Sequence, residues 1–327
     1  MDNTTYVMLG GAIICFAATA VLGKIFIPVL KSIKMGQKIL DIGPRWHKSK
    51  EGTPTMGGLF FIVPIVAVGA AIGVISGNSA IYIHLAFLLL NGAIGFIDDY
   101  VKFFKKQNAG LSPSQKMILQ FTVAAAYIFA LYATEHIDTV IKLPFTSESF
   151  ELNIVVYCLL AVVGIVFTVN SVNLTDGIDG LASSITAVVM VFMAALGFKT
   201  ENEIAVILSG CVIGGTLGFL VYNFYPAKVF MGDTGSLFLG AAVSSMAFVL
   251  DCPLLLIFTG FMYYVEAFSV IIQVTSYKLT KKRVFKMTPI HHHFEMSGWS
   301  EIKIVTVFSV ITALTCTLGS FGFLPVL

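Results

Sequence analysis

The sequence predicts an all-α polytopic membrane protein with about ten transmembrane helices, built as a single domain over residues 1–327. Three observations predict this class: 57% of the residues are hydrophobic, only 12% are charged, and the apolar residues lie in runs close to the ~20 residues that cross a bilayer as a helix. A soluble domain carries about a quarter charged residues. The lipid bilayer is therefore the expected surrounding, and a net charge of +2 gives no reason to expect nucleic acid as a partner.

Ten apolar segments account for most of the chain. They lie at residues 6–30, 57–77, 79–97, 117–134, 153–170, 181–198, 203–222, 236–250, 253–276 and 304–326. An even number of crossings places both termini on one side of the membrane. No basic region precedes the first segment, so we expect this helix to be retained and not cleaved as a signal.

Most of the 20 lysines and arginines lie in alternate connections between these segments, the distribution that marks cytoplasmic loops. They are Lys31, Lys34, Lys38, Arg45, Lys48, Lys50, Lys102, Lys105, Lys106, Lys116, Lys228, Lys278, Lys281, Lys282, Arg283, Lys286 and Lys303. We therefore expect these loops to face the cytoplasm and both termini to be extracytoplasmic.

Five aspartates lie at the cytoplasmic ends of predicted helices or in the adjoining loops: Asp98, Asp99, Asp176, Asp179 and Asp233. A charged side chain at the centre of a helix in lipid costs about 2.5–3.5 kcal/mol, so these residues must line a wet cavity or the membrane surface. Taken singly, each could cap a helix or solvate a loop. Five on one face, beside glycine-rich turns and lysines, favour a magnesium-dependent reaction on phosphates, because Mg²⁺ prefers oxygen ligands.

Two further charged motifs have more than one interpretation. Asp98 and Lys102 share a helical face, where they could hold a metal-linked group and a phosphate, or form an ordinary ion pair. His291, His292 and His293 are consecutive, and consecutive side chains on a helix point about 100° apart, so one metal cannot bind all three. We expect one or two of these histidines to contact phosphate. The alternative is that they form an ordinary solvent-exposed loop. Their spacing disfavours a zinc site.

Two weaker signals complete the candidates. The segment 52–58 precedes the second apolar run, where helix amides could bind an anion. Glu266 lies inside the ninth apolar segment and is a functional candidate, with a neutral or paired packing role as the alternative.

Five motifs together resemble one family. They are GTPTMGG (52–58), DDYVK (98–102), NLTDGIDGL (173–181), FMGDTGSL (230–237) and PIHHHFE (289–295). In this order they are similar to the phospho-N-acetylmuramoyl-pentapeptide transferase branch of the polyprenyl-phosphate N-acetylhexosamine-1-phosphate transferases. DDYVK and NLTDGIDG resemble the whole superfamily, whereas GTPTMGG and PIHHHFE resemble this branch.

The resemblance implies transfer of phospho-MurNAc-pentapeptide from UDP-MurNAc-pentapeptide to undecaprenyl phosphate, giving lipid I and UMP with Mg²⁺ as cofactor. It implies a multi-pass protein of the bacterial plasma membrane whose active site faces the cytoplasm, and leaves a homodimer open. By motif, Asp233 and Asp176 resemble metal ligands. The residues that resemble catalytic groups are Asp98, Asp99, Asp176, His291 and His292. Those implied in substrate binding are Lys50, Thr55, Lys102, Lys116, Asn170, Gly177, Ile178, Asp179, Asn223, Phe230, Gln273 and His293.

Two other functions stay open at this point. A related enzyme that transfers phospho-GlcNAc would share most motifs, and the histidine triplet argues against it. A secondary transporter could use the aspartates for cations, but transporters place such sites near the bilayer midplane, whereas these acids lie at one face. For the reaction itself we expect direct attack by the lipid phosphate, with an aspartyl intermediate as the alternative.

Overall fold

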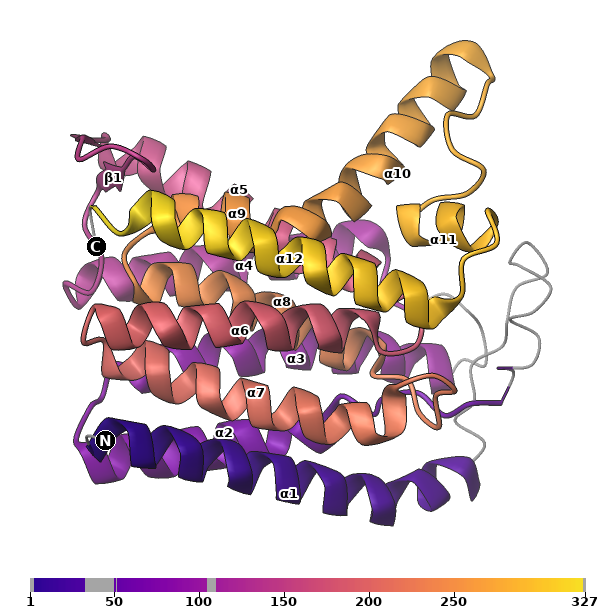
Figure 1. Ribbon diagram of the computed structural model, residues 1–327, viewed down its shortest axis with the longest axis horizontal. Helices are drawn as coiled ribbons and strands as arrows, with labels where there is room; N and C mark the ends of the chain where they lie inside the picture. Colours follow the sequence, from indigo (N-terminus) through magenta and orange to yellow (C-terminus); the bar gives the residue numbers. More distant parts are fainter. Residues whose placement is uncertain (1–2, 33–49, 51, 105–109, 326–327) are drawn as a thin grey trace.

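The computed structural model describes residues 3–32, 50, 52–104 and 110–325, and shows a bundle of long helices with one helix projecting from it (Figure 1). Six of the basic residues that predict the orientation lie outside the described residues: Lys34, Lys38, Arg45, Lys48, Lys105 and Lys106. Figure 1 marks the N- and C-termini at one end of the bundle, opposite the end that carries the short helix α11.

The elements follow the predicted segments closely. The helices are α1 (Asn3–Ser32), α2 (Leu59–Ser76), α3 (Ile81–Phe104), α4 (Pro113–Ala133), α5 (Ile154–Thr175), α6 (Leu181–Lys199), α7 (Glu203–Asn223), α8 (Gly232–Val249), η2 (Pro253–Leu255), α9 (Leu256–Thr259), α10 (Phe261–Thr280), α11 (Ile290–Glu295) and α12 (Glu301–Phe323). Strand β1 (Val140–Lys142) pairs antiparallel with β2 (Ser149–Glu151) between α4 and α5, with Ile141 opposite Phe150.

Within the described residues each of the ten predicted segments contains helix, and the polytopic α-helical class is confirmed. Within the described residues, eight helices are long and apolar enough to cross a membrane. The ninth predicted segment is broken: Pro253–Thr259 and Phe261–Thr280 meet at 77°, and counting this pair as one span gives up to nine. Helix α8 lies outside this set, since its sequence contains Asp233 and several Gly, Ser and Thr residues. A total of ten crossings therefore stays a prediction.

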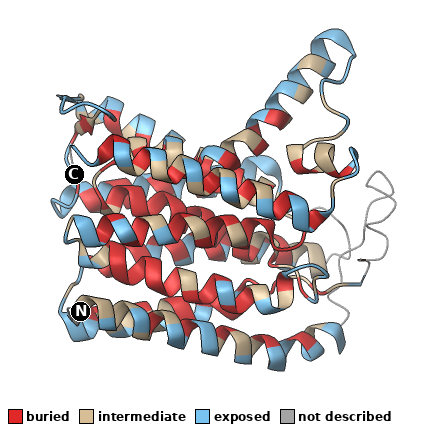
Figure 2. Cartoon of the chain, viewed as in Figure 1, coloured by how far each residue is buried: buried red, intermediate tan, exposed pale blue. Residues whose placement is uncertain are grey.

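Helix α8 forms the centre of the bundle. Nearly all of its residues are buried (Figure 2). It packs against α3 and α5. Its small side chains, such as Gly240, Ala241 and Ala242, allow neighbouring helices to approach closely, as is usual between helices in a membrane. Gly240 lies directly against the backbone of Val169 in α5. The first turn of α8 is thus held in a fixed place between two helices.

Polar residues define where several helices begin. Ser112 and Gln115 form a capping box before α4, in which the Ser112 side chain accepts from Gln115 N and the Gln115 side chain accepts from Ser112 N, and Pro113 takes the first helical position. This cap places Lys116 in the first turn of α4. Ser300 caps α12 through a single hydrogen bond, in which its hydroxyl accepts from the backbone N of Lys303 at 3.3 Å.

Helix α10 leaves the bundle at Gly260. A Cβ at this position would overlap the side chain of Tyr264 and crowd the carbonyl of Leu256, so glycine permits the sharp bend between α9 and α10. Figure 1 shows α10 projecting outward, and α11 lying between it and the bundle end. The bend therefore brings the histidine motif back towards the aspartate loops.

Candidate active site: a carboxylate group at the start of helix α8

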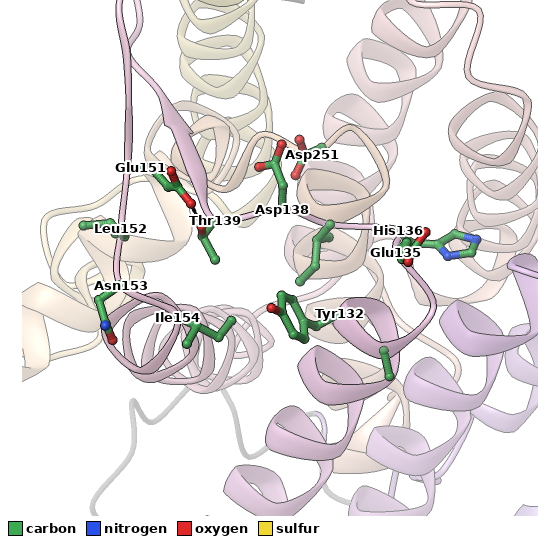
Figure 3. Close-up of a pocket in the computed structure, with 12 residues that line it drawn as sticks. Tyr132, Glu135, His136, Asp138, Thr139, Glu151, Leu152, Asn153, Ile154 and Asp251 are labelled. Carbon is green, nitrogen blue, oxygen red and sulfur yellow. Dashed lines mark hydrogen bonds between the residues drawn. The ribbon is translucent and has the colours of Figure 1, made fainter.

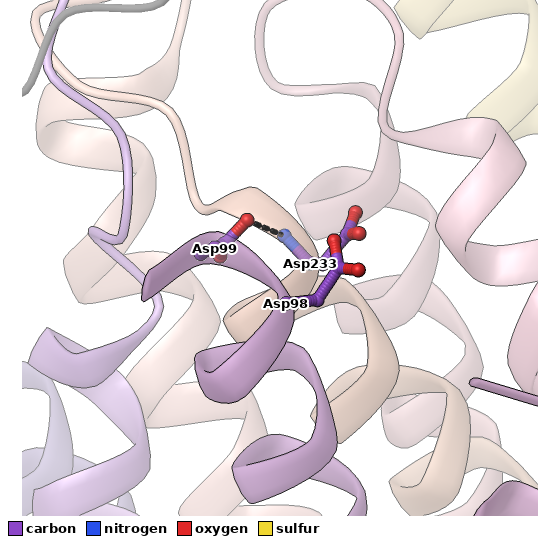
Figure 4. A group of neighbouring side chains, drawn as sticks. All are labelled: Asp98, Asp99 and Asp233. Carbon is purple, nitrogen blue, oxygen red and sulfur yellow. Dashed lines mark hydrogen bonds between the residues drawn. The ribbon is translucent and has the colours of Figure 1, made fainter. Parts of the chain in front are cut away.

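Asp98 and Asp99 at the end of α3 lie beside Asp233 in the first turn of α8 (Figure 4). One oxygen from each carboxylate lies within 4.8 Å of the others. Among the described residues, these three form the group of at least three Asp, Glu, His or Cys side chains whose ligand atoms lie close enough together to bind one metal ion. Its donors are all carboxylate oxygens, which suits Mg²⁺. We call Asp98, Asp99 and Asp233 the carboxylate group.

Two glycines make this juxtaposition possible. A Cβ at Gly95 would overlap the carbonyl oxygen of Asp233, so α3 and α8 touch backbone to backbone at this point. Gly232 has a φ of 70°, a conformation that favours glycine, and a Cβ there would overlap the Asp99 carboxylate. Asp99 and Asp233 are far apart in the sequence and are neighbours only because these positions lack a side chain.

The start of α8 binds Asp99 directly. Its carboxylate accepts hydrogen bonds from Thr234 N at 2.9 Å, from Thr234 Oγ1 at 2.7 Å and from Asp233 N at 3.2 Å. These amides are the unpaired donors of a helix N-terminus, where negative charge is stabilised. Asp98 instead accepts from Leu111 N at 2.8 Å. The two neighbouring aspartates are thus held by different elements.

Two lysines contact the carboxylate group. Lys102 pairs with Asp98 on the same helix, as the ordinary ion-pair interpretation expects, and its ammonium also lies 3.0 Å from Asp233 Oδ2. Lys116 reaches the same Asp233 oxygen at 2.9 Å from the first turn of α4. Two ammonium groups beside three carboxylates can both neutralise the acids and bind phosphate oxygens.

Asn173 is a member of this site that sequence reasoning missed. Its side-chain amide donates to Asp233 Oδ1 at 2.8 Å and to Ser236 Oγ at 2.7 Å. It opens the NLTDGIDG motif, and that place in the motif was the available signal. The predicted Asn170 lies one turn earlier on α5, where its amide donates to Gln120 Oε1 at 2.8 Å, so its role in binding stays a prediction.

Asp176 follows the last residue of α5 and is half-buried. Burial, and then the negative charges of Asp233, Asp99 and Asp179, raise the pKa of its carboxyl well above the usual value. Asp176 therefore lies near the carboxylate group but, within the described residues, is not one of the three close enough to share an ion. The sequence suggested that Asp176 binds a metal together with Asp233, whereas the structure places Asp98 and Asp99 beside Asp233. The role of Asp176 as a metal ligand stays a prediction.

A second charged cluster joins Lys50, Asp179 and Glu301. The Lys50 ammonium lies 2.7 Å from Asp179 Oδ1 and 2.7 Å from Glu301 Oε1. Burial lowers the pKa of Lys50, but hydrogen bonds to Asp179 and Glu301 more than compensate, and the net pKa is raised, so Lys50 is charged at neutral pH. Sequence reasoning named Lys50 and Asp179 and missed Glu301.

Other residues implied in substrate binding lie in segments that contact one another. Gly180 N donates to Asn223 Oδ1 at 3.2 Å, which ties the 173–181 loop to the end of α7. Phe230 N donates to the carbonyl of Pro54 at 2.8 Å, which ties the 52–58 segment to the loop before α8. In that segment Thr55 lies beside Gly232, where a Cβ would come within 2.9 Å of its hydroxyl. Ile178 is buried and Gly177 is exposed.

The three histidines contact three different groups. His291 is fully buried beside Glu266. Its imidazole also lies against Gly177, where an added Cβ would overlap the ring. His292 Nδ1 lies 2.6 Å from Glu295 Oε2. His293 Nδ1 accepts from Lys286 N at 3.2 Å. The three side chains point in different directions because they are consecutive residues of one helical turn.

Gln273, which the resemblance implies in substrate binding, lies on α10. Its carbonyl oxygen accepts from Val284 N at 2.9 Å and Phe285 N at 3.0 Å, and its amide donates to the Phe285 carbonyl at 3.0 Å. Gln273 therefore fixes the loop that leads to α11, and its contact with substrate stays a prediction.

A cavity of about 1000 Å³ lies at the opposite end of the bundle, between the end of α4 and the β1–β2 hairpin (Figure 3). Four carboxylates line it: Glu135, Asp138, Glu151 and Asp251. None of the predicted site residues lines this cavity. The residues that line this cavity are therefore separate from the predicted site residues.

Comparison with known proteins decides the family. The sequence profile of glycosyl transferase family 4 matches residues 81–251, and signature 1 of phospho-N-acetylmuramoyl-pentapeptide-transferase matches residues 50–62. The phospho-N-acetylmuramoyl-pentapeptide-transferase of Clostridium botulinum is 49% identical over 317 residues, which cover 95% of each chain. This chain belongs to the phospho-N-acetylmuramoyl-pentapeptide-transferase family. The predicted family is thereby confirmed.

Family membership extends over nearly the whole chain. The relative from Acetivibrio thermocellus is 45% identical over 312 residues, covering 95% of this chain and 93% of that one. The family profile spans α3 to α8 and so contains the carboxylate group, and the signature contains Lys50 and Thr55. The chain is accordingly a transferase enzyme.

Proposed function

We propose that this chain transfers phospho-MurNAc-pentapeptide from UDP-MurNAc-pentapeptide to undecaprenyl phosphate, forming lipid I and releasing UMP. One observation supports this most directly: the carboxylate group and two lysines meet at one point of a bundle of apolar helices. Phosphoryl transfer needs little beyond positioning and neutralisation of charge, and this arrangement provides both.

We assign the carboxylate group to a Mg²⁺ ion. Its oxygen donors and the short separations between them fit this ion, which when bound would neutralise charge on the diphosphate. Asp99 is already fixed by three donors at the start of α8, so it would provide a rigid ligand oxygen. Lys102 and Lys116 would bind phosphate oxygens, since each approaches Asp233 from a different helix.

The acceptor needs no strong general base. A phosphate monoester has a second pKa near ~6, so the lipid phosphate is largely a dianion at neutral pH. We therefore expect its oxygen to attack the β-phosphorus of the donor directly, with UMP leaving in the same step. The alternative is a covalent intermediate on Asp176 or a neighbouring carboxylate.

The Lys50 cluster would bind the nucleoside end of the donor. Asn223 accepts from Gly180 N, next to Asp179, and donates to the carbonyl of Val229, which precedes Phe230. The aromatic side chain of Phe230 would stack on the uracil ring. His291 and His292 would contact the diphosphate or sugar, since α11 packs over the loop that carries Asp176.

We further propose a bacterial plasma-membrane location, ten crossings, both termini outside and the carboxylate group at the cytoplasmic face. The basic loops support this orientation, as does the placement of both termini at one end of the bundle (Figure 1). A homodimer is compatible with this arrangement. The transporter alternative loses support because the acids gather at the end of α3 and the start of α8 and not midway along a helix.

The test is product analysis. Purified protein with Mg²⁺ and undecaprenyl phosphate would receive UDP-MurNAc-pentapeptide and UDP-GlcNAc together, and the lipid products would be identified by mass spectrometry. We expect lipid I alone. If a GlcNAc-phosphate lipid were the main product, the chain would instead be the related enzyme. The match of the family signature at residues 50–62 disfavours that alternative.

A further inference from the structure

Glu301 is the first residue of α12 and lies with only 8% of its surface exposed. Its Oε2 accepts a hydrogen bond from the backbone N of Asp179 at 2.9 Å and another from the Lys50 ammonium at 2.7 Å. Its second oxygen also lies 2.7 Å from Lys50. The side chain thus touches two residues that come from distant parts of the chain.

The contacts of Glu301 complete the polar environment of Asp179. Asp179 Oδ1 binds Lys50 at 2.7 Å, and Oδ2 accepts from Ala227 N at 2.8 Å. The backbone N–H of Asp179 donates to Glu301. Asp179 is buried, so removal of this acceptor would leave a buried donor without a partner, which is costly.

A role in capping α12 does not account for this placement. Ser300 already caps the helix through its hydroxyl, which accepts from Lys303 N. An acidic residue in the first helical turn gains stability near the helix N-terminus even when it faces solvent. Burial of the carboxylate against a lysine is therefore not needed for the helix, and its cost points to another purpose.

We propose that Glu301 is a positioning residue for the nucleoside end of the donor substrate. It fixes the Lys50 ammonium and the Asp179 backbone together, so that both groups face the nucleotide in one arrangement before it binds. Because α12 carries Glu301 directly after α11, the same carboxylate joins the histidine segment to the nucleotide pocket. This inference rests on the proposed function and deepens it.

The matched test compares Glu301→Gln with Glu203→Gln. Both glutamates lie in the first turn of an apolar helix, but Glu203 is exposed at the start of α7, a 21-residue helix whose other end, Asn223, contacts the 173–181 loop. In Glu301→Gln we expect KM for UDP-MurNAc-pentapeptide and Kd for UMP to rise about tenfold or more, since the negative charge that pairs with Lys50 is lost and one acceptor oxygen becomes an NH2 donor. In Glu301→Gln, both kcat and the KM for undecaprenyl phosphate should change little. Glu203→Gln should match the wild type in all of these constants.

Two additional variants separate positioning from a general loss of structure. Glu301→Asp keeps the charge, so its donor KM should lie between those of the wild type and Glu301→Gln; this variant also serves if the glutamine form does not fold. In a double-mutant cycle, Glu301→Gln added to Lys50→Met should raise the Kd of UMP less than it does alone, because the two side chains act together.

Wild-type donor KM and UMP Kd in Glu301→Gln would overturn the inference. So would a fall in kcat with both constants unchanged, or equal effects of Glu301→Asp and Glu301→Gln. Failure of the wild type to make lipid I would instead refute the proposed function, so the two failures are distinguishable.

Discussion

His291 Nδ1 lies 3.1 Å from Glu266 Oε1, and both side chains are completely buried. The backbone N of His291 also donates to the second oxygen of Glu266 at 3.3 Å. On its other side the imidazole lies against Gly177, where no side chain could be accommodated. Glu266 on α10 therefore orients a histidine of α11 towards the loop that carries Asp176.

Replacement of Glu266 by glutamine should impair catalysis. We expect kcat to fall about ten- to a hundredfold, by analogy with the loss seen when the partner that orients a metal-binding histidine is removed. Steady-state kinetics with both substrates would measure this, and the thermal unfolding temperature would report on the fold. Normal kcat in a well-folded variant would show that Glu266 has only a packing role.

Asp233→Asn should abolish turnover while the bundle still folds. Asp233 is the member of the carboxylate group that contacts Lys102, Lys116 and Asn173, so loss of its charge weakens both ion and phosphate binding. Activity would be measured over a range of Mg²⁺ concentrations. Asp138→Asn, at the opposite end of the bundle, is the control and should be fully active. Near-normal activity of Asp233→Asn at ordinary Mg²⁺ would contradict the assignment.

Gly95→Ala should be strongly disruptive, although it adds a single methyl group. That methyl would overlap the Asp233 carbonyl, so α3 and α8 would have to separate and the carboxylate group would open. We expect a lower unfolding temperature and loss of most activity. Gly164→Ala on α5 is the matched control, because its Cβ would meet no atom within 4 Å. Equal behaviour of the two variants would refute a close helix contact.

The orientation can be tested with single cysteines in a cysteine-free background. Arg283 and Glu148 are both exposed and lie in connections that we place on opposite sides of the membrane. An impermeant thiol reagent added to intact cells should label a cysteine at Glu148 and spare one at Arg283. The reverse pattern would invert the proposed topology.

Direct attack and a covalent intermediate differ in what happens without the acceptor. Delipidated enzyme would be incubated with the UDP-donor and isotopically labelled UMP. Direct attack predicts that no label enters the donor, because UMP leaves only when the lipid phosphate is present. Exchange at a rate comparable to turnover, unchanged by more stringent lipid removal, would demonstrate a covalent intermediate.

The sequence predicts the helices well because apolar length is a local property. Each of the ten predicted segments contains helix within the described residues. The polar Glu266 suggested a bend in the ninth segment, but the break lies earlier, at Gly260, because its position depends on the contacts of Gly260 with neighbouring groups. Motifs located the five aspartates but not their grouping. Asp98 and Asp99 meet Asp233 because Gly95 and Gly232 permit close packing, which no local pattern reveals.

Residues outside the strongest motifs were harder to predict. Glu301 follows the histidine motif by a few residues and looks like an ordinary first-turn acid. Its contact with Asp179 spans 122 positions in the sequence, so only the fold could disclose it.

The backbone contact between Gly95 and Asp233 also affects how a metal ion would enter and leave the carboxylate group. The three carboxylates repel one another to the extent that Lys102 and Lys116 do not neutralise them, yet the backbones that carry Asp98, Asp99 and Asp233 cannot separate while α3 and α8 touch. This repulsion is therefore overcome once, when the helices assemble, and not again at each catalytic cycle. An arriving cation would find its ligands already in place, so its exchange rate should depend on how fast it sheds water and not on any movement of the helices.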